Sequence, residues 1–295
     1  MNMKIADIKT ESSIDGRCKS CFQKTYNRLF IKYDVGATQR LAFFIFFRDM
    51  LNKYKKKTTP EIQRILNNKF RKIIGVADPF EEEKDFCNQS ALELYKVWKP
   101  KVVSADNPFD LALRLAIAGN IMDYGANNSF DVNDTIKDVI HADFAIDHSL
   151  LLNQKIKQAK NILFLGDNAG EIVFDRLFIE TIKHNKVIYA VKGSAVLNDV
   201  CIKDAKDVEM ELYADVISNG YDAPSTVLSS CSREFREAFR SADLIISKGQ
   251  GNLEGLLYLQ DPRIFFLLIV KCEVIAEILE VEKGSIVVYN QNNQN

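Results

Sequence analysis

The feature that most constrains the fold is a change of pattern near Ala142, where helical periodicity gives way to short apolar runs that alternate with helices. These runs are rich in β-branched or aromatic residues and occupy residues 162–165, 187–191, 244–247, 264–270 and 286–289. Strands that alternate with helices form a parallel sheet with helices on both faces. We therefore predict a Rossmann-like, three-layer α/β/α domain over residues 152–295.

The preceding part of the chain has helical patterns separated by turn signals. Thr58, with Glu61 three residues later, has the pattern of a capping box at a helix start. The apolar run 41–47 lies in another helical stretch, and we expect it to be well buried. Residues 1–151 are therefore predicted to form an all-helical N-terminal subdomain.

One helix of this part is apolar around most of its circumference. It begins at Asn107-Pro108 and is expected to continue to Tyr124, before Gly125. Such a helix packs against several others, so the polar Asn120 within it needs a partner. Asn120 either bonds a neighbouring backbone group or faces a binding site.

Charge and composition exclude several classes of protein. The 39 basic and 40 acidic residues give a net charge of -1, which provides no field to attract nucleic acid or an anionic membrane surface. The longest apolar runs fall well short of the roughly 20 residues of a membrane span. Six cysteines dispersed over 295 residues are typical of reduced thiols. We expect a cytoplasmic globular protein, while its oligomeric state is not indicated.

The first predicted strand of the sheet ends in Gly166-Asp-Asn-Ala-Gly-Glu171. Asp167 and Asn168 thus follow a buried strand, where open α/β sheets bind their ligands, and Gly170 leaves the backbone amides accessible. Oxygen ligands followed by bare amides suit a hard cation and the phosphate it neutralises. The same residues are also ordinary N-caps, so this junction alone permits both interpretations.

Two further junctions have the same design, at residues 191–199 and 247–254. Because parallel strands end at a common edge, all three loops can converge there. They contribute oxygen ligands, cations and bare backbone: Asp167, Asn168, Asp199, Lys192, Lys248, Gly170, Gly249 and Gly251. This inventory fits a divalent metal together with a phosphate.

The same segments resemble a known family. Residues 165–171, 197–199 and 247–252 are similar to the signature segments of the metal-dependent damage-control phosphatases, formerly a domain of unknown function. Further segments resemble the prokaryotic branch of that family: Ala-Ile-Ala-Gly-Asn at 116–120, Cys18-Lys-Ser-Cys21 and Lys271-Cys272. The similar segments span nearly the whole chain and follow the order of the family.

The resemblance implies a helical subdomain on a Rossmann-like sheet and a divalent metal, Mn, Co, Ni or Mg, held by Asp167, Asn168 and Asp199. It also implies phosphate contacts from Asn120, Lys248, Gly249, Gln250, Gly251 and Asn252. Gly170, Glu171 and Lys192 complete the predicted substrate-binding set. Asp167, Asp199 and Lys248 are the predicted catalytic residues.

A metal held by two carboxylates and one amide keeps a positive charge and open positions, so it can bind a phosphoryl oxygen and acidify a water. The water would attack phosphorus in small phosphate esters such as sugar phosphates or damaged metabolites, and Lys248 and the loop amides would stabilise the developing charge. Asp199 or Glu171 would orient the water. Asp167 as a covalent nucleophile is the alternative.

Two other functions stay open at this point. One is an S-adenosylmethionine-dependent carboxyl methyltransferase, a label that relatives in the family have carried, and the other is a metal- or nucleotide-binding regulator without turnover. The Asp-Asn-Asp oxygen set favours the phosphatase, because methyl transfer needs no hard metal.

The Cys18-x-x-Cys21 pair is a second candidate site. A closed zinc site needs four ligands and the chain has no second Cys-x-x-Cys. Cys272, or in second place Cys87, could complete a cluster if the fold brings it near the pair. The alternative is that these residues are ordinary buried thiols.

Overall fold

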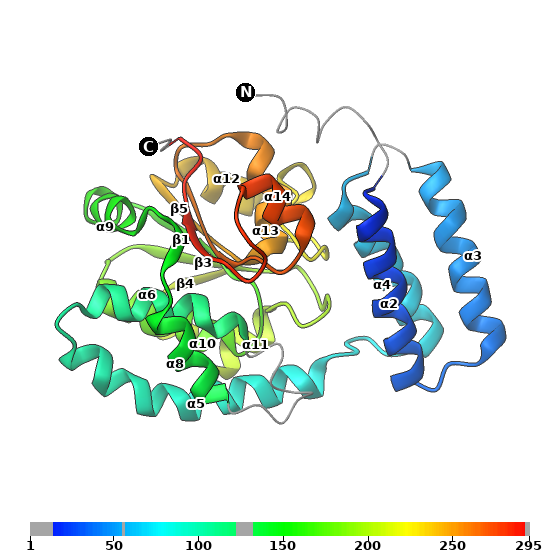
Figure 1. Cartoon of the computed structure of the whole chain (residues 1–295), viewed down its shortest axis with the longest axis horizontal. Helices are drawn as coiled ribbons and strands as arrows, with labels where there is room; N and C mark the ends of the chain where they lie inside the picture. The colour runs from blue at the N-terminus through cyan, green and yellow to red at the C-terminus, as the bar shows by residue number, and fades with distance from the viewer. Residues whose placement is uncertain (1–13, 55–56, 122–131, 293–295) are drawn as a thin grey trace.

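The computed structural model describes residues 14–54, 57–121 and 132–292, and it contains a seven-stranded sheet in the order β1-β7-β6-β5-β2-β3-β4 (Figure 1). The strands are β1 (Phe144–Asp147), β2 (Ile162–Leu165), β3 (Val187–Val191), β4 (Asp215–Ser218), β5 (Leu244–Lys248), β6 (Ile264–Ile269) and β7 (Ile286–Tyr289). The five neighbouring strands β6, β5, β2, β3 and β4 are parallel to one another, as predicted. Only β7 pairs antiparallel to its neighbour β6, and β1 then pairs parallel to β7.

The helices precede the sheet in sequence and then alternate with its strands. Those before β1 are α2 (Gly16–Lys32), α3 (Ala37–Lys53), α4 (Thr59–Ile74), α5 (Glu81–Ser104), α6 (Pro108–Ala118) and α8 (Val132–His141). Those after β1 are α9 (Ser149–Gln158), α10 (Glu171–Ile182), α11 (Ile202–Asp207), α12 (Arg233–Ser241), α13 (Gly249–Leu256) and α14 (Glu273–Leu279).

Helices cover both faces of the sheet, which confirms the predicted three-layer α/β/α architecture (Figure 1). Side chains on β2 alternate between the two faces: Ile162 and Phe164 pack in the core shared with α6 and α10, whereas Leu163 and Leu165 pack in the core shared with α12, α13 and α14. All four are buried, as expected for a central strand between two helical layers. Helix α5 crosses the outside of the α10 layer.

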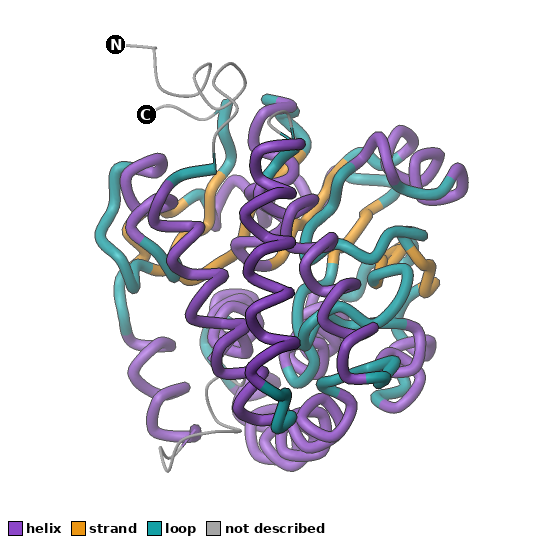
Figure 2. Tube along the Cα trace, turned by 90° about the vertical axis from the view of Figure 1, so that its right-hand side faces the viewer, coloured by secondary structure: helices purple, strands orange, loops and turns teal. Residues whose placement is uncertain are grey.

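Helices α2, α3 and α4 form a separate three-helix group with its own aromatic core (Figure 2). Phe30 lies between Phe43 and Phe70, with ring centroids 5.0 and 5.6 Å away. The capping box predicted at the start of α4 is present. Arg64 and Asn68 on α4 bond Asp222, which ties this group to the loop after β4.

The predicted burial of the run 41–47 was wrong for part of its length. Phe43 and Phe47 are buried, but the side chains of Leu41 and Ile45 are 63% and 43% exposed. Helix α3 is the outer helix of its group, so only one side of it meets other helices (Figure 1). An apolar sequence therefore did not ensure burial on all sides.

The sequence analysis did not predict two of the strands. β1 and β4 have four residues each and lie at the two edges of the sheet. Their side chains are only partly buried, so neither carries a continuous apolar run. β1 belongs to the sheet although it precedes residue 152, within the part predicted to be all-helical.

Helix α6 begins where the sequence predicted, with the side chain of Asn107 accepting a hydrogen bond from the amide of Asp110. The α-helix ends at Ala118 and continues as a 3₁₀ turn to Ile121. The predicted end at Tyr124 lies outside the described residues. Within the described ranges, none of the helices has the length and apolar character needed to cross a membrane.

Candidate functional site

The structure brings together the three predicted metal ligands at the carboxyl edge of the sheet. Asp167 and Asn168 follow β2, and Asp199 lies in the loop after β3. An isolated β-bridge joins Asn168 to Asp199, and the amide of Val200 donates to the carbonyl of Asp167 at 2.9 Å. The two loops are thus held to each other by backbone hydrogen bonds, which fixes the spacing of their side chains.

Asn120 faces this site from the 3₁₀ turn that follows α6. Its Nδ2 donates to Asp167 Oδ2 at 3.2 Å and to Glu171 Oε2 at 2.9 Å. Asn168 Nδ2 donates to the same Asp167 oxygen at 2.8 Å. Of the two interpretations of Asn120, the structure supports the one in which its amide faces a site.

Gly249 provides the space that the Asp167 carboxylate occupies. A Cβ at this position would lie 1.9 Å from Asp167 Oδ2 and 2.2 Å from its Cγ, and φ is +75°. Both the contact and the left-handed backbone require glycine here. Part of the predicted glycine-rich loop therefore makes room for the Asp167 carboxylate directly.

Lys248 lies beneath the site and is fully buried. Its Nζ donates to Glu171 Oε1 at 2.6 Å, to Asp175 Oδ1 at 2.5 Å and to the carbonyl of Ala116 at 2.8 Å. Burial opposes the charged form, but the two carboxylates hold the pKa of Lys248 above its usual value. Because an ammonium has three N–H groups, all are used here, and the predicted contact of Lys248 with phosphate stays a prediction.

Lys192 is the cation nearest to a predicted metal ligand. Its buried Nζ lies 3.4 Å from Asp199 Oδ2 and donates to Asn252 Oδ1 at 3.0 Å. Asn252 also accepts from the hydroxyl of Thr226, and its own Nδ2 donates to the carbonyls of Gly166 and Lys248. Asn252 thus links three strand ends and orients Lys192.

Other predicted substrate-binding groups have partners of their own. The amide of Gly170 donates to Asn88 Oδ1 at 2.7 Å, and Gly251 packs where a Cβ would lie 2.3 Å from the carbonyl of Pro224. Gln250 Nε2 lies 3.3 Å from Cys272 Sγ, and the side-chain Oε1 of Gln250 accepts from the backbone amide of Lys271. The side chain of Gln250 is therefore directed toward Lys271 and Cys272.

Sequence reasoning missed the polar side chains that support these loops. On α5, Lys84 binds Asp204 at 3.0 Å and Asn88 holds Gly170. One helix face therefore contacts both the Gly170 loop and helix α11, which follows the Asp199 loop. Asp175, the second partner of Lys248, also accepts from Tyr189. The sequence did contain a signal for Asp175, because it lies four residues after Glu171 in the same helix and so shares its face.

Comparison with known proteins identifies the family of the chain. The family model of the damage-control phosphatase ARMT1-like domain matches residues 14–287. The chain belongs to this family. The damage-control phosphatase PH1575 of Pyrococcus horikoshii is 36% identical over 254 residues, covering 84% of this chain and 88% of the relative. A damage-control phosphatase of Archaeoglobus fulgidus is 32% identical over 229 residues, covering 75% of this chain and 79% of the relative.

A solved structure agrees with the fold of this damage-control phosphatase family member. The crystal structure of a DUF89 family protein from Pyrococcus horikoshii matches with a TM-score of 0.87 and 32% sequence identity. The alignment covers 96% of this chain and all of the crystallised chain. The family resemblance of the signature segments is thereby confirmed.

The donor set of this ARMT1-like site fits a divalent metal. Its buried carboxylates outnumber its buried lysines by two: Asp167, Glu171, Asp175 and Asp199 against Lys192 and Lys248. Burial, reinforced by Glu171 and Asp199, raises the pKa of Asp167 well above its usual value. Two carboxylates and an amide are oxygen donors that hard cations prefer, and a divalent ion would balance the excess charge.

The cysteine prediction has a different outcome in this family member. Burial raises the pKa of Cys18 to about 12, and nearby Glu254 and Cys272 contribute, so the fold does bring α2 and the start of α14 together. Within the described part of the chain, the six cysteines form no disulfide. Among the described residues, His, Cys, Asp and Glu side chains form no group of three arranged to hold a metal. A cysteine-bound metal therefore stays a prediction.

Proposed function

We propose that the protein is a metal-dependent phosphatase that hydrolyses small phosphate esters, such as sugar phosphates or damaged phosphometabolites. The observation that carries this proposal is the convergence of Asp167, Asn168 and Asp199 beside the buried cation of Lys192. Membership in the damage-control phosphatase family and the names of the relatives support the same activity.

Asp167, Asn168 and Asp199 would hold the metal, with Mn, Co, Ni and Mg as the candidates. When bound, a divalent ion supplies Lewis acidity to a phosphoryl oxygen and lowers the pKa of a water. Asn120 and Gly249 keep the Asp167 carboxylate in place through a hydrogen bond and a close contact. Pre-positioned ligands of this kind reduce the reorganisation needed during the reaction.

Lys192 is the side chain best placed to bind the phosphoryl group. Its Nζ donates a hydrogen bond to Asn252 and forms an ion pair with Asp199 at 3.4 Å, and an ammonium has three N–H groups, so one can donate to a phosphoryl oxygen. Lys248 would act from the buried layer beneath the site, where its positive charge compensates the negative charges of Glu171 and Asp175.

We propose water as the nucleophile. Asp167 Oδ2 already accepts from two amides and packs on Gly249, which suits a ligand better than an attacking group. Asp199 or Glu171 would orient the water. The partner is a small phosphate ester. We propose the cytoplasm as the location of the protein, in keeping with described cysteines that form no disulfide.

Phosphate release from chelator-stripped protein tests this proposal. A panel of sugar phosphates and nucleotides is assayed with Mg²⁺, Mn²⁺, Co²⁺ or Ni²⁺ added back, for wild type, Asp167→Ala and Asp215→Ala. Asp215 is an exposed carboxylate at an edge strand and serves as the matched control. We expect metal-dependent release that is lost only in Asp167→Ala. No release above that variant with any metal would refute the proposal and make S-adenosylmethionine binding the next measurement.

A further inference from the structure

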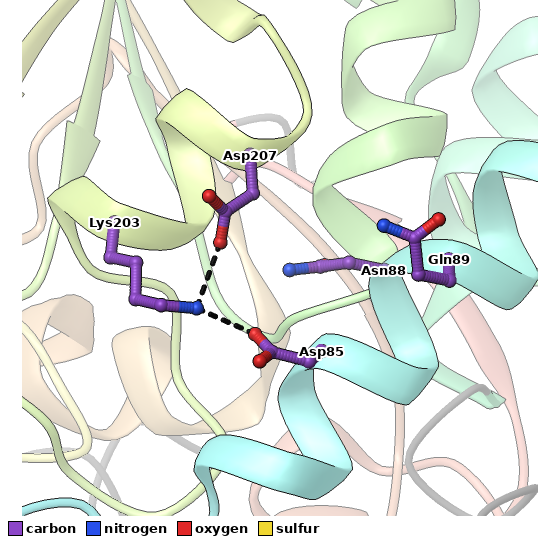
Figure 3. Close-up of a pocket in the computed structure, with 5 residues that line it drawn as sticks. All are labelled: Asp85, Asn88, Gln89, Lys203 and Asp207. Carbon is purple, nitrogen blue, oxygen red and sulfur yellow. Dashed lines mark hydrogen bonds and ion pairs between the residues drawn. The ribbon is translucent and has the colours of Figure 1, made fainter.

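A polar cavity lies between α5 and α11, outside the site described above. Its volume is about 320 Å³, and its lining residues are Asp85, Asn88, Gln89, Lys203 and Asp207 (Figure 3). Lys203 Nζ donates to Asp85 at 2.7 Å and to Asp207 at 2.9 Å across the opening. All five lining side chains are polar, so the cavity suits a ligand that forms hydrogen bonds.

Asn88 is the buried member of this lining, with 1% of its surface exposed. Its Oδ1 accepts from the amide of Gly170, but its Nδ2 has no hydrogen-bond partner among the described residues. Figure 3 shows the amide nitrogen directed into the space between α5, Lys203 and Asp207. A buried donor without a partner costs free energy, and an acceptor atom in the cavity would remove that cost.

The lining also restricts the chemistry of the ligand. Asn88 Nδ2 lacks an acceptor, and the carboxylates of Asp85 and Asp207, although paired with Lys203, can accept further hydrogen bonds. A hydroxyl group can both accept and donate. Two carboxylates against one ammonium leave a net negative charge that disfavours anions, phosphate included. An ammonium ligand would offer no acceptor to Asn88. The size is near the lower end of small-molecule sites, about 300 Å³.

We propose that this cavity binds a neutral polyhydroxylated molecule of monosaccharide size. The site goes beyond the proposed phosphatase activity and is separate from the predicted metal ligands. Asn88 lies between the two, because its oxygen holds the loop at Gly170 and its nitrogen faces the cavity.

The test measures binding to metal-free full-length protein by titration calorimetry and saturation-transfer NMR. The probes are glucose, fructose, ribose and myo-inositol. Asn88→Asp keeps an oxygen for the Gly170 amide and replaces the donor that faces the cavity with a second carboxyl oxygen. Gln89→Ala removes a second lining group, and Gln23→Ala, an exposed amide on α2, is the matched control.

We expect saturable binding of at least one probe at millimolar concentration, weakened at least about tenfold in Asn88→Asp and less strongly in Gln89→Ala, with no change in Gln23→Ala. The absence of saturable binding by every probe would overturn the proposal. Affinity that is unchanged in both cavity variants, or displacement of the probe by a phosphate ester, would overturn it as well. No turnover or metal is involved, so this result and the phosphatase assay can fail independently.

Discussion

Replacing Gly249 with alanine tests the contact that places Asp167. The new Cβ would lie 1.9 Å from Asp167 Oδ2, and ordinary van der Waals contact begins at 3.4 Å. The carboxylate or the loop must therefore move by about 1.5 Å, and a misplacement of about 1 Å at a reacting centre can cost roughly 100-fold in rate. The left-handed φ of +75° adds roughly 1–2 kcal/mol of backbone strain.

Gly75→Ala is the matched control, because Gly75 has a φ of +70° and open space around its Cβ position. Both variants carry the backbone strain, but only Gly249→Ala adds the overlap with Asp167, so Gly249→Ala should lose more unfolding free energy in urea denaturation. Only Gly249→Ala should lower kcat/KM for phosphate release by about 100-fold or more and weaken metal binding measured by calorimetry. Equal kcat/KM values for the two variants would refute the argument that this glycine positions Asp167.

Three further predictions concern buried charge, pH and thiol reactivity. Lys248→Met leaves two buried carboxylates without their cation and should lower the free energy of unfolding by about 3–5 kcal/mol in urea denaturation, whereas an unchanged value would contradict the buried ion pairs. Although burial opposes it, hydrogen bonds from Asn68 and Arg64 lower the pKa of Asp222 below 3.8, so the folded state binds fewer protons than the unfolded state. The stability difference between wild type and Asp222→Asn, about 1 kcal/mol at neutral pH, should therefore shrink as pH falls below 3.8, and a constant difference would refute this. Burial raises the pKa of Cys18 to about 12, so iodoacetamide should label it more slowly than the exposed Cys21 at about pH 8, with labelling rates measured by peptide mass spectrometry. Equal rates would show that burial does not govern the reactivity of Cys18.

The elements that the sequence predicted correctly are those whose signal is local. β2, β3 and β7 have the predicted bounds, because a strand buried on both faces must be apolar throughout its length. The edge strands β1 and β4 lack this signal, since none of their residues is fully buried. The exposure of Leu41 shows the converse, because an apolar residue is not buried unless another element covers it.

In the candidate site, too, the sequence predicted some neighbouring residues and not others. Asp167 and Asn168 directly follow a buried strand, and the common edge of parallel strands brings Asp199 to them, so the sequence alone placed these three together. The partners of Lys248 were not predictable by that reasoning. Glu171 and Asp175 lie more than 70 residues away in sequence, and only the packing of α10 against the end of β5 brings them into contact.

By itself, the sequence determined the layered α/β fold, the strand ends that carry the polar loops and the set of oxygen donors at those ends. These properties depend on periodicity and on residues adjacent in the chain. The tertiary structure alone decided that Gly249 accommodates Asp167, that Asn88 holds Gly170, and that Lys248 is buried between carboxylates. The physical reason is that a buried polar group takes its partner from whichever element the fold places beside it, and sequence distance does not record that choice.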